Sequence, residues 1–375
     1  MNSRKKLFIH GIRGIPASHG GFETFAEFLA PYLVEHGWDV TVYCQELGNG
    51  KPYTDHWKGV ELIHIPVSGD GAKGSVVFDW LTVKDACAKQ GLNLTLGYNT
   101  AIFSAYLRLK KKTNLINMDG IEWKRQKWSK PVQAWLYLNE RLGCLLGNHL
   151  IADHPEILNH LASRVSRDKI TMIPYGSNLL EGSDPSVLER FGIEPRSYAI
   201  VIARPEPENS ILEIVSAFAS KPRKHQLVVL GNYDSETNPY HKEVLDAANS
   251  SVKFVGAIYD QEVVNVLRFH ARLYIHGHQV GGTNPSLVEL LGAGAPVLAH
   301  DNRFNRWVAG SGAHFFENES ECRQELDAIL DDDQELSRMS AASRAQHAQM
   351  FTWDKILGAY DELLTDWHSR LPAAR

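Results

Sequence analysis

The chain has 375 residues, of which 43% are hydrophobic and 22% are charged, as in ordinary water-soluble globular proteins. This length exceeds what one ordinary core accommodates, so it predicts two domains. The formal net charge of −5 excludes a generally basic protein that coats nucleic acid. The 4 cysteines are scattered without a CxxC pair or zinc spacing, which is typical of free thiols in a reducing compartment.

The start of the chain, MNSRKKLFIHGIRG, has too few apolar residues before its first glycine for a signal peptide or a membrane span. No later segment approaches the roughly 18 apolar residues that a spanning helix needs. We therefore expect a soluble, cytoplasmic protein.

Apolar runs of strand length alternate with amphipathic runs of helix length, the pattern of doubly wound parallel α/β sheets. After the first strand come a glycine-bearing loop and a helix over residues 22–37. The first series of strands is expected at residues 6–10, 39–45, 61–67, 92–98, 113–119, 149–154 and 169–176. The second series is expected at residues 198–203, 225–231, 252–257, 272–277 and 295–301.

A passage rich in glycine, serine and proline separates the two series. We expect a Rossmann-like domain over residues 1–175, a linker over 176–195 and a second Rossmann-like domain over 196–350. Residues 351–375 read as an amphipathic helix that packs back towards the first domain. Open α/β sheets bind ligands outside the carboxyl ends of their strands, so the cleft between two such domains is the expected site.

The stretch GIRGIPASHGGFETF follows the first strand and leads into a helix that starts near Gly21. Amides at a helix start favour an anion, and glycines such as Gly20 let a ligand approach the backbone. The glycine spacing is not that of GxGxxG. A plain flexible loop and a degenerate nicotinamide site therefore stay open as alternatives.

The stretch VIARPEPENS places Arg204 directly after a strand, where a fixed cation would suit a diphosphate. The alternative is a surface arginine in an ordinary salt bridge.

Residues 274–301 place two histidines, two glycines and an Asn-Pro between a strand and a helix. Ser286 and Leu287 occupy positions where free helix-start amides favour an anion. Glu289, one turn further, could accept hydrogen bonds from a vicinal diol such as a ribose, or merely complement the helix dipole. His276 and His278, each taken alone, are expected to be hydrogen-bonded structural histidines.

The stretch NMDGIEWKRQKWSKPVQAWLYLNERL follows another strand. Asp119 and Glu122 could do acid–base work or bind sugar hydroxyls. The basic, tryptophan-rich run after them suits a surface that rests on anionic lipid headgroups. A solvated helix face with core tryptophans is an equally good interpretation of that run.

With these motifs together, the chain resembles the retaining glycosyltransferases of family 4, over nearly its whole length. Their GT-B fold has two Rossmann-like domains that face a central cleft. The similarity is greatest to a bacterial branch that holds many polysaccharide rhamnosyltransferases. It is carried by GIRGIPASHGGFETFAEFLAPYL, DGIEWKRQKWSK, ARPEPENS and HGHQVGGTNPSLVELLGAGAPVLA.

The resemblance implies an acceptor-binding first domain and a second domain that binds a nucleotide-sugar donor. Arg204 matches the arginine that holds the diphosphate, and Glu289 matches the glutamate that binds the nucleotide ribose. Asp119 lies roughly where relatives carry a histidine by the reacting centre, so these three are the expected catalytic residues. The other implied donor contacts are Gly20, Gly21, Asn209, His278, Gly281, Gly282, Thr283, Asn284, Ser286 and Leu287. The implied acceptor contacts are Asp119, Glu122, Trp123 and Lys124.

Two positions depart from the family pattern. The first glutamate of a pair eight positions apart falls at Gly281, and the lysine that accompanies the arginine falls at Asn209. Both changes remove a charge from the donor site, which implies altered donor recognition.

The expected reaction transfers a sugar to an undecaprenyl-diphosphate-linked saccharide in the synthesis of a bacterial cell-surface polysaccharide (O-antigen or capsule). The first expectation for the sugar is L-rhamnose, taken from dTDP-rhamnose. The enzyme would act at the anionic cytoplasmic face of the inner membrane, without a metal or cofactor and without nucleic acid. Alternatives are a UDP-hexose donor, a nucleotide-sugar epimerase of the same fold, a nicotinamide-dependent enzyme, and a non-catalytic subunit that binds a nucleotide.

Overall fold

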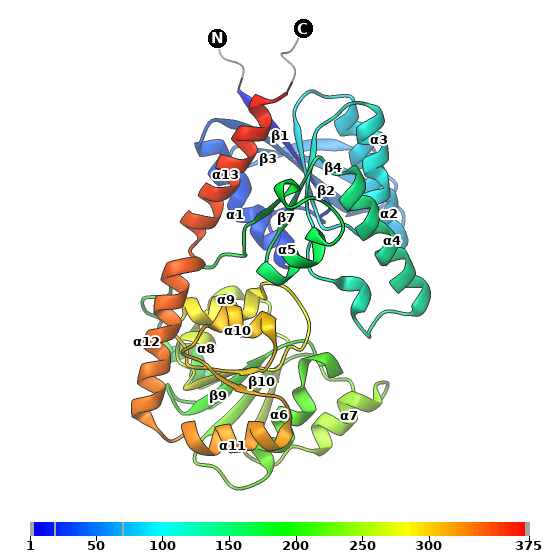
Figure 1. Cartoon of the computed structure of the whole chain (residues 1–375). Coiled ribbons are helices and arrows are strands. Elements are labelled where there is room, and N and C mark those ends of the chain that lie inside the picture. The colour runs from blue at the N-terminus through cyan, green and yellow to red at the C-terminus, as the bar shows by residue number, and fades with distance from the viewer. Residues whose placement is uncertain (1–3, 19, 70, 372–375) are drawn as a thin grey trace. The chain divides into compact units, whose positions relative to one another are not determined.

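The computed structural model describes residues 4–18, 20–69 and 71–371. The chain forms two compact units: unit 1 is Met1–Pro174 with Trp353–Arg375, and unit 2 is Tyr175–Thr352. Each unit is an α/β structure on a mainly parallel sheet, so the predicted fold class is confirmed (Figure 1).

The described residues of unit 1 form an eight-stranded sheet in the order β3-β4-β2-β1-β5-β6-β7-β8. Its strands are β1 Lys5–His10, β2 Trp38–Leu47, β3 Tyr53–Trp57, β4 Val60–Val67, β5 Leu92–Leu96, β6 Asn114–Asn117, β7 His149–Ala152 and β8 Ile170–Met172. Its helices are α1 Gly21–Glu35, α2 Gly71–Cys87, α3 Ser104–Leu109, α4 Lys130–Leu146, α5 Pro155–Ala162 and α13 Trp353–Ser369. Short 3-10 turns lie at η1 Ala101–Phe103, η2 Glu122–Lys124 and η3 Arg167–Lys169.

Unit 2, all of whose residues are described, has a six-stranded parallel sheet in the order β11-β10-β9-β12-β13-β14. Its strands are β9 Tyr198–Ile202, β10 Gln226–Leu230, β11 Val252–Gly256, β12 Leu273–His276, β13 Val297–His300 and β14 His314–Phe316. Its helices are α6 Ile211–Ala219, α7 Pro239–Asp246, α8 Gln261–Phe269, α9 Pro285–Gly292, α10 Arg303–Ala309, α11 Glu319–Ile329 and α12 Asp333–Met350. The 3-10 turns are η4 Pro185–Phe191 and η5 Pro207–Asn209.

The strands form where the sequence has runs of apolar residues that are buried on both faces. Leu7 and Phe8 of β1 face opposite sides of the sheet, pair in parallel register with β2 and β5, and are 0% and 4% exposed. Such two-sided burial is what helices on both faces of a parallel sheet produce. Every strand range expected from the sequence overlaps an observed strand.

Strand β3 was not predicted. It runs antiparallel to β4 after a tight turn in which Lys58 (φ 47°) and Gly59 (φ 78°) both have positive φ. The strand is almost wholly exposed, so it lacks the apolar run that marks the buried strands. The turn, by contrast, resembles the two-residue hairpins that glycine favours.

The passage expected to be a linker, residues 176–195, is instead part of unit 2. It contains η4, and its Leu188 and Ile193 are 1% and 6% exposed in the core that includes β9 and β10. A few apolar residues within a polar passage are enough to anchor it. The two units divide after Pro174 and again after Thr352, so α13 packs in unit 1, where Tyr360 contacts Phe25 of α1.

None of the helices within the described ranges is both long and apolar enough to cross a membrane.

Candidate active site

The sheet of unit 2 has a topological switch point between β9 and β12. From β9 the chain continues to β10 and β11 on one side, and from β12 it continues to β13 and β14 on the other. Loops that leave two such strands diverge, which opens a crevice at the carboxyl edge of the sheet. Arg204 follows β9, and the loop of residues 277–284 follows β12, so the main donor candidates lie at this edge.

Backbone contacts hold the two loops together. The Gln279 amide donates to Glu208 O at 2.9 Å, and a Cβ added to Gly277 would lie 2.0 Å from Asn209 O. Only glycine therefore fits at position 277. On the other side, Asn305 Nδ2 of α10 donates to the carbonyl of His278 and to that of His300, each at 2.8 Å. We name this assembly of residues 203–210, 277–284 and 300–305 the unit 2 edge.

Arg204 is exposed, and its guanidinium has no hydrogen-bond or ion-pair partner among the described residues. Its carbonyl accepts hydrogen bonds from the Glu206 amide at 2.7 Å and from Asn209 Nδ2 at 2.8 Å. The loop backbone is therefore ordered, while the cation itself stays available to a ligand. The alternative interpretation, a surface arginine in a salt bridge, is not what the structure shows.

Asn209, expected as a donor contact, is 3% exposed, and its side-chain amide nitrogen donates a hydrogen bond within the loop, to Arg204 O. Its Oδ1 has no hydrogen-bond partner among the described atoms. Asn209 therefore shapes the loop that carries Arg204.

The start of α9 does not present free amides at the two expected positions. Asn284 Oδ1 accepts from the Ser286 amide at 3.0 Å, and Asn284 O accepts from the Leu287 amide at 3.1 Å. Asn284 is thus an N-cap, which the Asn-Pro sequence favours. An anion at this helix end would have to share or displace these bonds, so the expectation of free amides is corrected.

Gly281, before α9, leaves open space. Gly281 has φ 155°, and a Cβ added there would meet no atom within 4 Å. Gly281 and Gly282 are half-buried, whereas Thr283 is only 4% exposed. The position where the family glutamate is missing is therefore an unfilled part of the unit 2 edge.

Glu289 pairs with Arg268 of α8, a residue that the sequence did not single out. The side chain of Arg268 is 5% exposed and that of Glu289 is 22% exposed. Arg268 Nη1 also donates to Asn265 Oδ1 at 3.1 Å. Glu289 thus neutralises a buried cation while keeping part of its carboxylate open to a ligand, and both roles fit its position.

His276 and His278 stack with 4.3 Å between ring centroids and 13° between planes. His276 is fully buried, and its Nδ1 lies 2.8 Å from the Tyr274 hydroxyl. Burial and the nearby His278 and His300 hold the pKa of His276 well below 6.5. His276 is therefore a neutral core histidine, and His278 covers it from the loop.

In unit 1 the switch point lies between β1 and β5. Gly11 follows β1 with φ 81°, and a Cβ there would lie 2.3 Å from Leu96 O at the end of β5. The loop after β1 is not a plain flexible loop, because carboxylates of α1 hold it. Glu23 Oε1 accepts from the Arg13 amide at 3.0 Å, and Glu27 Oε2 accepts from the Ala17 amide at 2.9 Å.

The start of α1, unlike that of α9, has no side-chain cap in the described part of the chain. Gly20 is the N-cap residue with φ 80°, Gly21 begins the helix, and no described side chain caps it. Uncapped first-turn amides attract anions. Of the two helix starts expected to bind an anion, α1 is thus the better prepared.

Asp119 lies two residues after β6 and has φ 52°, a conformation that Asp and Asn tolerate better than other residues. Its amide donates to Asn117 Oδ1 at 3.1 Å, and its Oδ1 accepts from the Gly120 amide at 2.7 Å. Burial, followed by the negative charges of Glu122 and Asp153, raises the pKa of Asp119 to about 7. A carboxyl that titrates near neutrality is a candidate functional group.

The carboxylate of Glu122 is already engaged within its own loop. It accepts from Arg125 Nη1 at 2.8 Å and from Trp128 Nε1 at 3.2 Å, with Lys127 Nζ at 3.9 Å. The structure therefore gives Glu122 a loop-stabilising role, and the expected acceptor contact would have to compete with these bonds.

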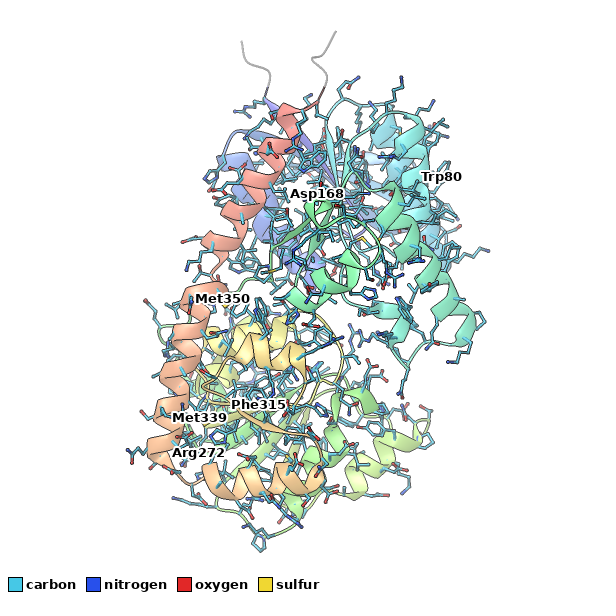
Figure 2. The ribbon with its side chains drawn as sticks, in the orientation of Figure 1. Trp80, Asp168, Arg272, Phe315, Met339 and Met350 are labelled. Atoms are coloured by element: carbon cyan, nitrogen blue, oxygen red, sulfur yellow. The ribbon has the colours of Figure 1, made fainter. Side chains whose placement is uncertain are left out.

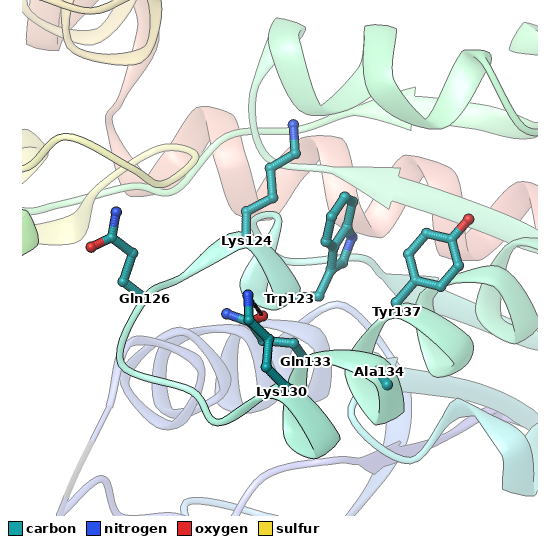
Figure 3. A pocket seen from close by; sticks show the side chains of 7 residues that line it. All are labelled: Trp123, Lys124, Gln126, Lys130, Gln133, Ala134 and Tyr137. Atoms are coloured by element: carbon teal, nitrogen blue, oxygen red, sulfur yellow. Dashed lines mark hydrogen bonds between the residues drawn. The ribbon is translucent and has the colours of Figure 1, made fainter.

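Trp123 is held by Glu140 of α4, whose Oε2 accepts from its indole nitrogen at 2.6 Å. The Lys124 ammonium lies 5.4 Å from the centroid of the Trp123 ring. Both side chains project to the same side as Tyr137 (Figure 3). These two expected acceptor residues therefore line one common surface.

Two family models match the chain. Residues 4–178 match a family described as "Domain of unknown function (DUF1972)", and residues 188–346 match "Glycosyl transferases group 1". The second match spans the unit 2 edge and Glu289. No curated protein matches the sequence.

Solved structures cover almost the whole chain. Sucrose-phosphate synthase from Thermosynechococcus elongatus has TM-score 0.83 at 18% identity, covering 98% of this chain and 100% of its own. Anabaena HepE in complex with UDP and glucose has TM-score 0.75 at 14% identity, covering 97% and 100%. The α,α-trehalose 6-phosphate synthase from Burkholderia multivorans has TM-score 0.73 at 12% identity, covering 99% of each chain.

Likenesses at these identities show the fold, which is the GT-B arrangement of two Rossmann-like domains. Residues 188–346 match the glycosyl transferases group 1 family, and the protein is a glycosyltransferase with the GT-B fold.

Proposed function

We propose that the protein is a retaining glycosyltransferase that takes its sugar from a nucleoside diphosphate sugar bound at the unit 2 edge. The observation that carries this proposal is the exposed, unpaired guanidinium of Arg204 at the β9/β12 switch point. A planar cation with fixed donors suits a diphosphate better than any other group at this edge.

The donor would lie across residues from both loops. Its diphosphate would contact Arg204, its sugar would occupy the open space beside Gly281 and Gly282, and its ribose hydroxyls would bind Glu289. Arg268 would position Glu289, because an ion pair with a buried guanidinium restricts the carboxylate.

The chemistry is departure of a diphosphate from the anomeric carbon. Breaking the bond between the anomeric carbon and the phosphate oxygen leaves one more negative charge on the diphosphate, so a preorganised cation at that position lowers the barrier. In the retaining route proposed here, the acceptor hydroxyl attacks from the same face, and the departing phosphate takes its proton. Arg204 and Glu289 would bind the donor and Asp119 would contact sugar or acceptor, so no side-chain nucleophile is needed.

We infer dTDP-rhamnose as the first donor to test, from the resemblance of four motifs to rhamnosyltransferases. The second candidate is a UDP-hexose. It is favoured by solved structures of similar fold, since HepE was crystallised with UDP-glucose and a trehalose-6-phosphate protein of E. coli with UDP-2-fluoro glucose. The match to glycosyl transferases group 1 supports transfer over the epimerase alternative.

The proposed reaction uses no metal or cofactor, because Arg204 would stabilise the charge of the departing diphosphate. Within the described ranges, no group of three or more His, Cys, Asp or Glu residues is arranged to hold a metal ion. Whether a divalent ion enters with the donor is decided by the binding experiment below.

For the acceptor we propose an undecaprenyl-diphosphate-linked saccharide at an anionic membrane surface. Helix α3 packs against α2 and α4 (Figure 1), and all three carry exposed apolar side chains. We call these residues the amphipathic face: Val77, Trp80, Leu109, Trp135, Leu138 and Leu145, which are 38% to 75% exposed. Trp80 lies at the outer margin of unit 1 in Figure 2.

Cations accompany this face. Lys110, Lys111, Lys130 and Arg141 are exposed on or beside α3 and α4. Apolar side chains that insert between headgroups, together with cations that pair with lipid phosphates, favour an anionic lipid surface.

The membrane proposal is tested by pelleting the protein with phosphatidylglycerol vesicles and with phosphatidylcholine vesicles. Binding should require the anionic lipid, weaken in high salt, and be lost in Leu138→Glu/Leu145→Glu. The control Leu47→Glu changes a leucine at the end of β2 that is 72% exposed and lies outside the amphipathic face, and it should bind normally. Salt-insensitive binding, or none, would contradict the proposal.

The donor proposal is tested by calorimetry with dTDP, UDP, GDP and their sugars, with and without chelator. We expect one nucleotide to bind tightly in the presence of chelator, and product analysis with and without acceptor then separates transfer from epimerisation. Absence of binding by every nucleotide, with or without added Mg²⁺, would overturn the donor site.

A further inference from the structure

Unit 1 has an open hollow where η2 meets the first two turns of α4. Its volume is about 450 Å³, within the range of sites for small molecules. The side chains that matter for its chemistry are Trp123, Lys124, Gln126, Lys130, Gln133 and Tyr137 (Figure 3).

Two aromatic rings form one wall. The centroids of Trp123 and Tyr137 are 5.2 Å apart, and their planes stand at 86°. Tyr137 is 41% exposed although it lies on a helix that packs against the domain. Two perpendicular rings offer apolar faces of the kind on which the C–H groups of a pyranose pack.

The wall is held from behind by a buried polar network. Glu140 is 1% exposed, and it contacts the Trp123 indole at 2.6 Å, His160 Nε2 at 3.0 Å and Arg164 Nε at 2.7 Å. A carboxylate with partners from η2, from α5 and from the turn that follows α5 restrains the indole before any ligand arrives. Such preorganisation lowers the entropy cost of binding.

Cations surround the rings. Lys124 lies over Trp123, Lys130 is exposed, and the guanidinium carbons of Arg141 and Arg164 lie 5.8 Å and 5.5 Å from the Tyr137 ring centroid. The nearest acid in this network, Glu140, is buried and paired. The hollow therefore carries a local excess of positive charge, which favours an anionic ligand.

Amides complete the lining. Gln133 is held in place, since its Nε2 donates to Arg125 O at 3.1 Å and its Oε1 accepts from Lys130 Nζ at 3.2 Å. Gln126 is exposed on the facing loop. An amide both donates and accepts, which suits sugar hydroxyl groups.

We propose that this hollow binds a phosphorylated saccharide, with its sugar ring against Trp123 and Tyr137 and its phosphate on Lys124 and Lys130. The proposal rests on the proposed function, because it names the chemistry of the acceptor in that reaction. The phosphate belongs either to a lipid-linked saccharide or to a free sugar phosphate. Both sources offer the same group to the hollow.

The test is calorimetric titration of the full chain with four probes: glucose, inorganic phosphate, glucose 1-phosphate and geranyl diphosphate-linked glucose. A probe that has both a sugar and a phosphate should bind about tenfold more tightly than glucose or phosphate alone, because it makes both sets of contacts. Tighter binding of the geranyl probe than of glucose 1-phosphate identifies a lipid-linked ligand, and equal binding identifies a free sugar phosphate.

Variants then locate the site. Tyr137→Ala and the double variant Lys124→Gln/Lys130→Gln should each weaken binding about tenfold, since a ring contact or charge-assisted bonds are lost. Tyr137→Phe keeps the ring and should bind within about twofold of wild type. Lys58→Gln is the matched control, because Lys58 likewise lies over a neighbouring indole, 4.5 Å from the Trp57 ring centroid, but outside the hollow.

Equal affinity of wild type and Tyr137→Ala for every probe would overturn the proposal. Nucleotide binding, measured on the same samples, separates it from the donor proposal. Normal nucleotide binding without phosphosugar binding contradicts only the hollow, and the reverse result contradicts only the donor site.

Discussion

The unit 2 edge and the loop of residues 119–128 in unit 1 both follow parallel strands, but the second adds a network of side chains. At the unit 2 edge, most bonds involve backbone groups, such as the Gln279 amide on Glu208 O. The unit 1 loop has backbone bonds as well, such as the Glu122 amide on Gly120 O, and it adds bonds between side chains, such as Trp123 on Glu140.

This difference indicates how each region tolerates change. Backbone contacts persist when side chains are replaced, so the unit 2 edge keeps its shape while single residues such as Arg204 supply the chemistry. A side-chain network is lost with any of its members, so the unit 1 loop couples its shape to its sequence.

The largest effect is expected from removing the unpaired cation of the unit 2 edge. Arg204→Ala should lower the transfer rate on the order of 10² to 10³-fold, because a preorganised cation on the leaving group is lost. The midpoint of thermal unfolding should not change, since the guanidinium has no partner among the described residues. Arg323→Ala, which removes an exposed arginine of α11, is the matched control and should leave the rate unchanged.

If Arg204→Ala kept full activity, the diphosphate would bind elsewhere, and the unit 2 edge would be a structural feature only.

The second effect separates the two roles of Glu289. Glu289→Gln should destabilise the protein by roughly 3 kcal/mol, because it leaves Arg268 as a buried charge without its partner. Arg268→Met/Glu289→Gln should recover most of this stability in urea unfolding. Affinity for the nucleotide should fall about tenfold in both variants, because the hydrogen bonds of a carboxylate to the ribose are lost.

A double variant with wild-type nucleotide affinity would show that Glu289 serves the ion pair alone.

The smallest effect concerns Asp119 and pH. Burial and neighbouring carboxylates raise its pKa to about 7, so the folded protein binds this proton more tightly than the unfolded chain does. The stability from the protonated form is therefore present at low pH and is lost as pH rises through about 7. The variant Asp119→Asn has no carboxyl group to ionise at this position, so it keeps this stability as the pH rises. Its free energy of unfolding should exceed that of wild type by roughly 1 to 3 kcal/mol above pH 8, and by less at pH 5.

The measurement is thermal unfolding of both proteins from pH 5 to pH 9. Asp168 is an exposed carboxylate of the same unit (Figure 2), whose pKa is lowered, chiefly by the hydrogen bond from Ser166. Asp168→Asn should therefore show no gain at high pH. A difference between Asp119→Asn and wild type that does not depend on pH would contradict the raised pKa.

Much of the fold could be predicted because buried parallel strands leave contiguous apolar runs in the sequence. β9 and β12 are examples, and the rule that ligands bind beyond strand ends then placed Arg204 and residues 277–284 at one edge. Strand β3 could not be predicted in this way, because it is almost wholly exposed and has no run of buried apolar residues. The sequence of residues 176–195 indicates a linker because only a few apolar residues, Leu188 among them, anchor this passage in the core of unit 2.

The sequence by itself determined the two α/β units and most of their strands, because these depend on local composition and periodicity. Only the tertiary structure decided which residues contact one another. Arg268 meets Glu289 from 21 positions away, Glu140 meets Trp123 from 17, and the amides of α9 are capped while those of α1 are not. Such pairings follow from how helices and loops pack around a sheet, and no local pattern in the sequence records them.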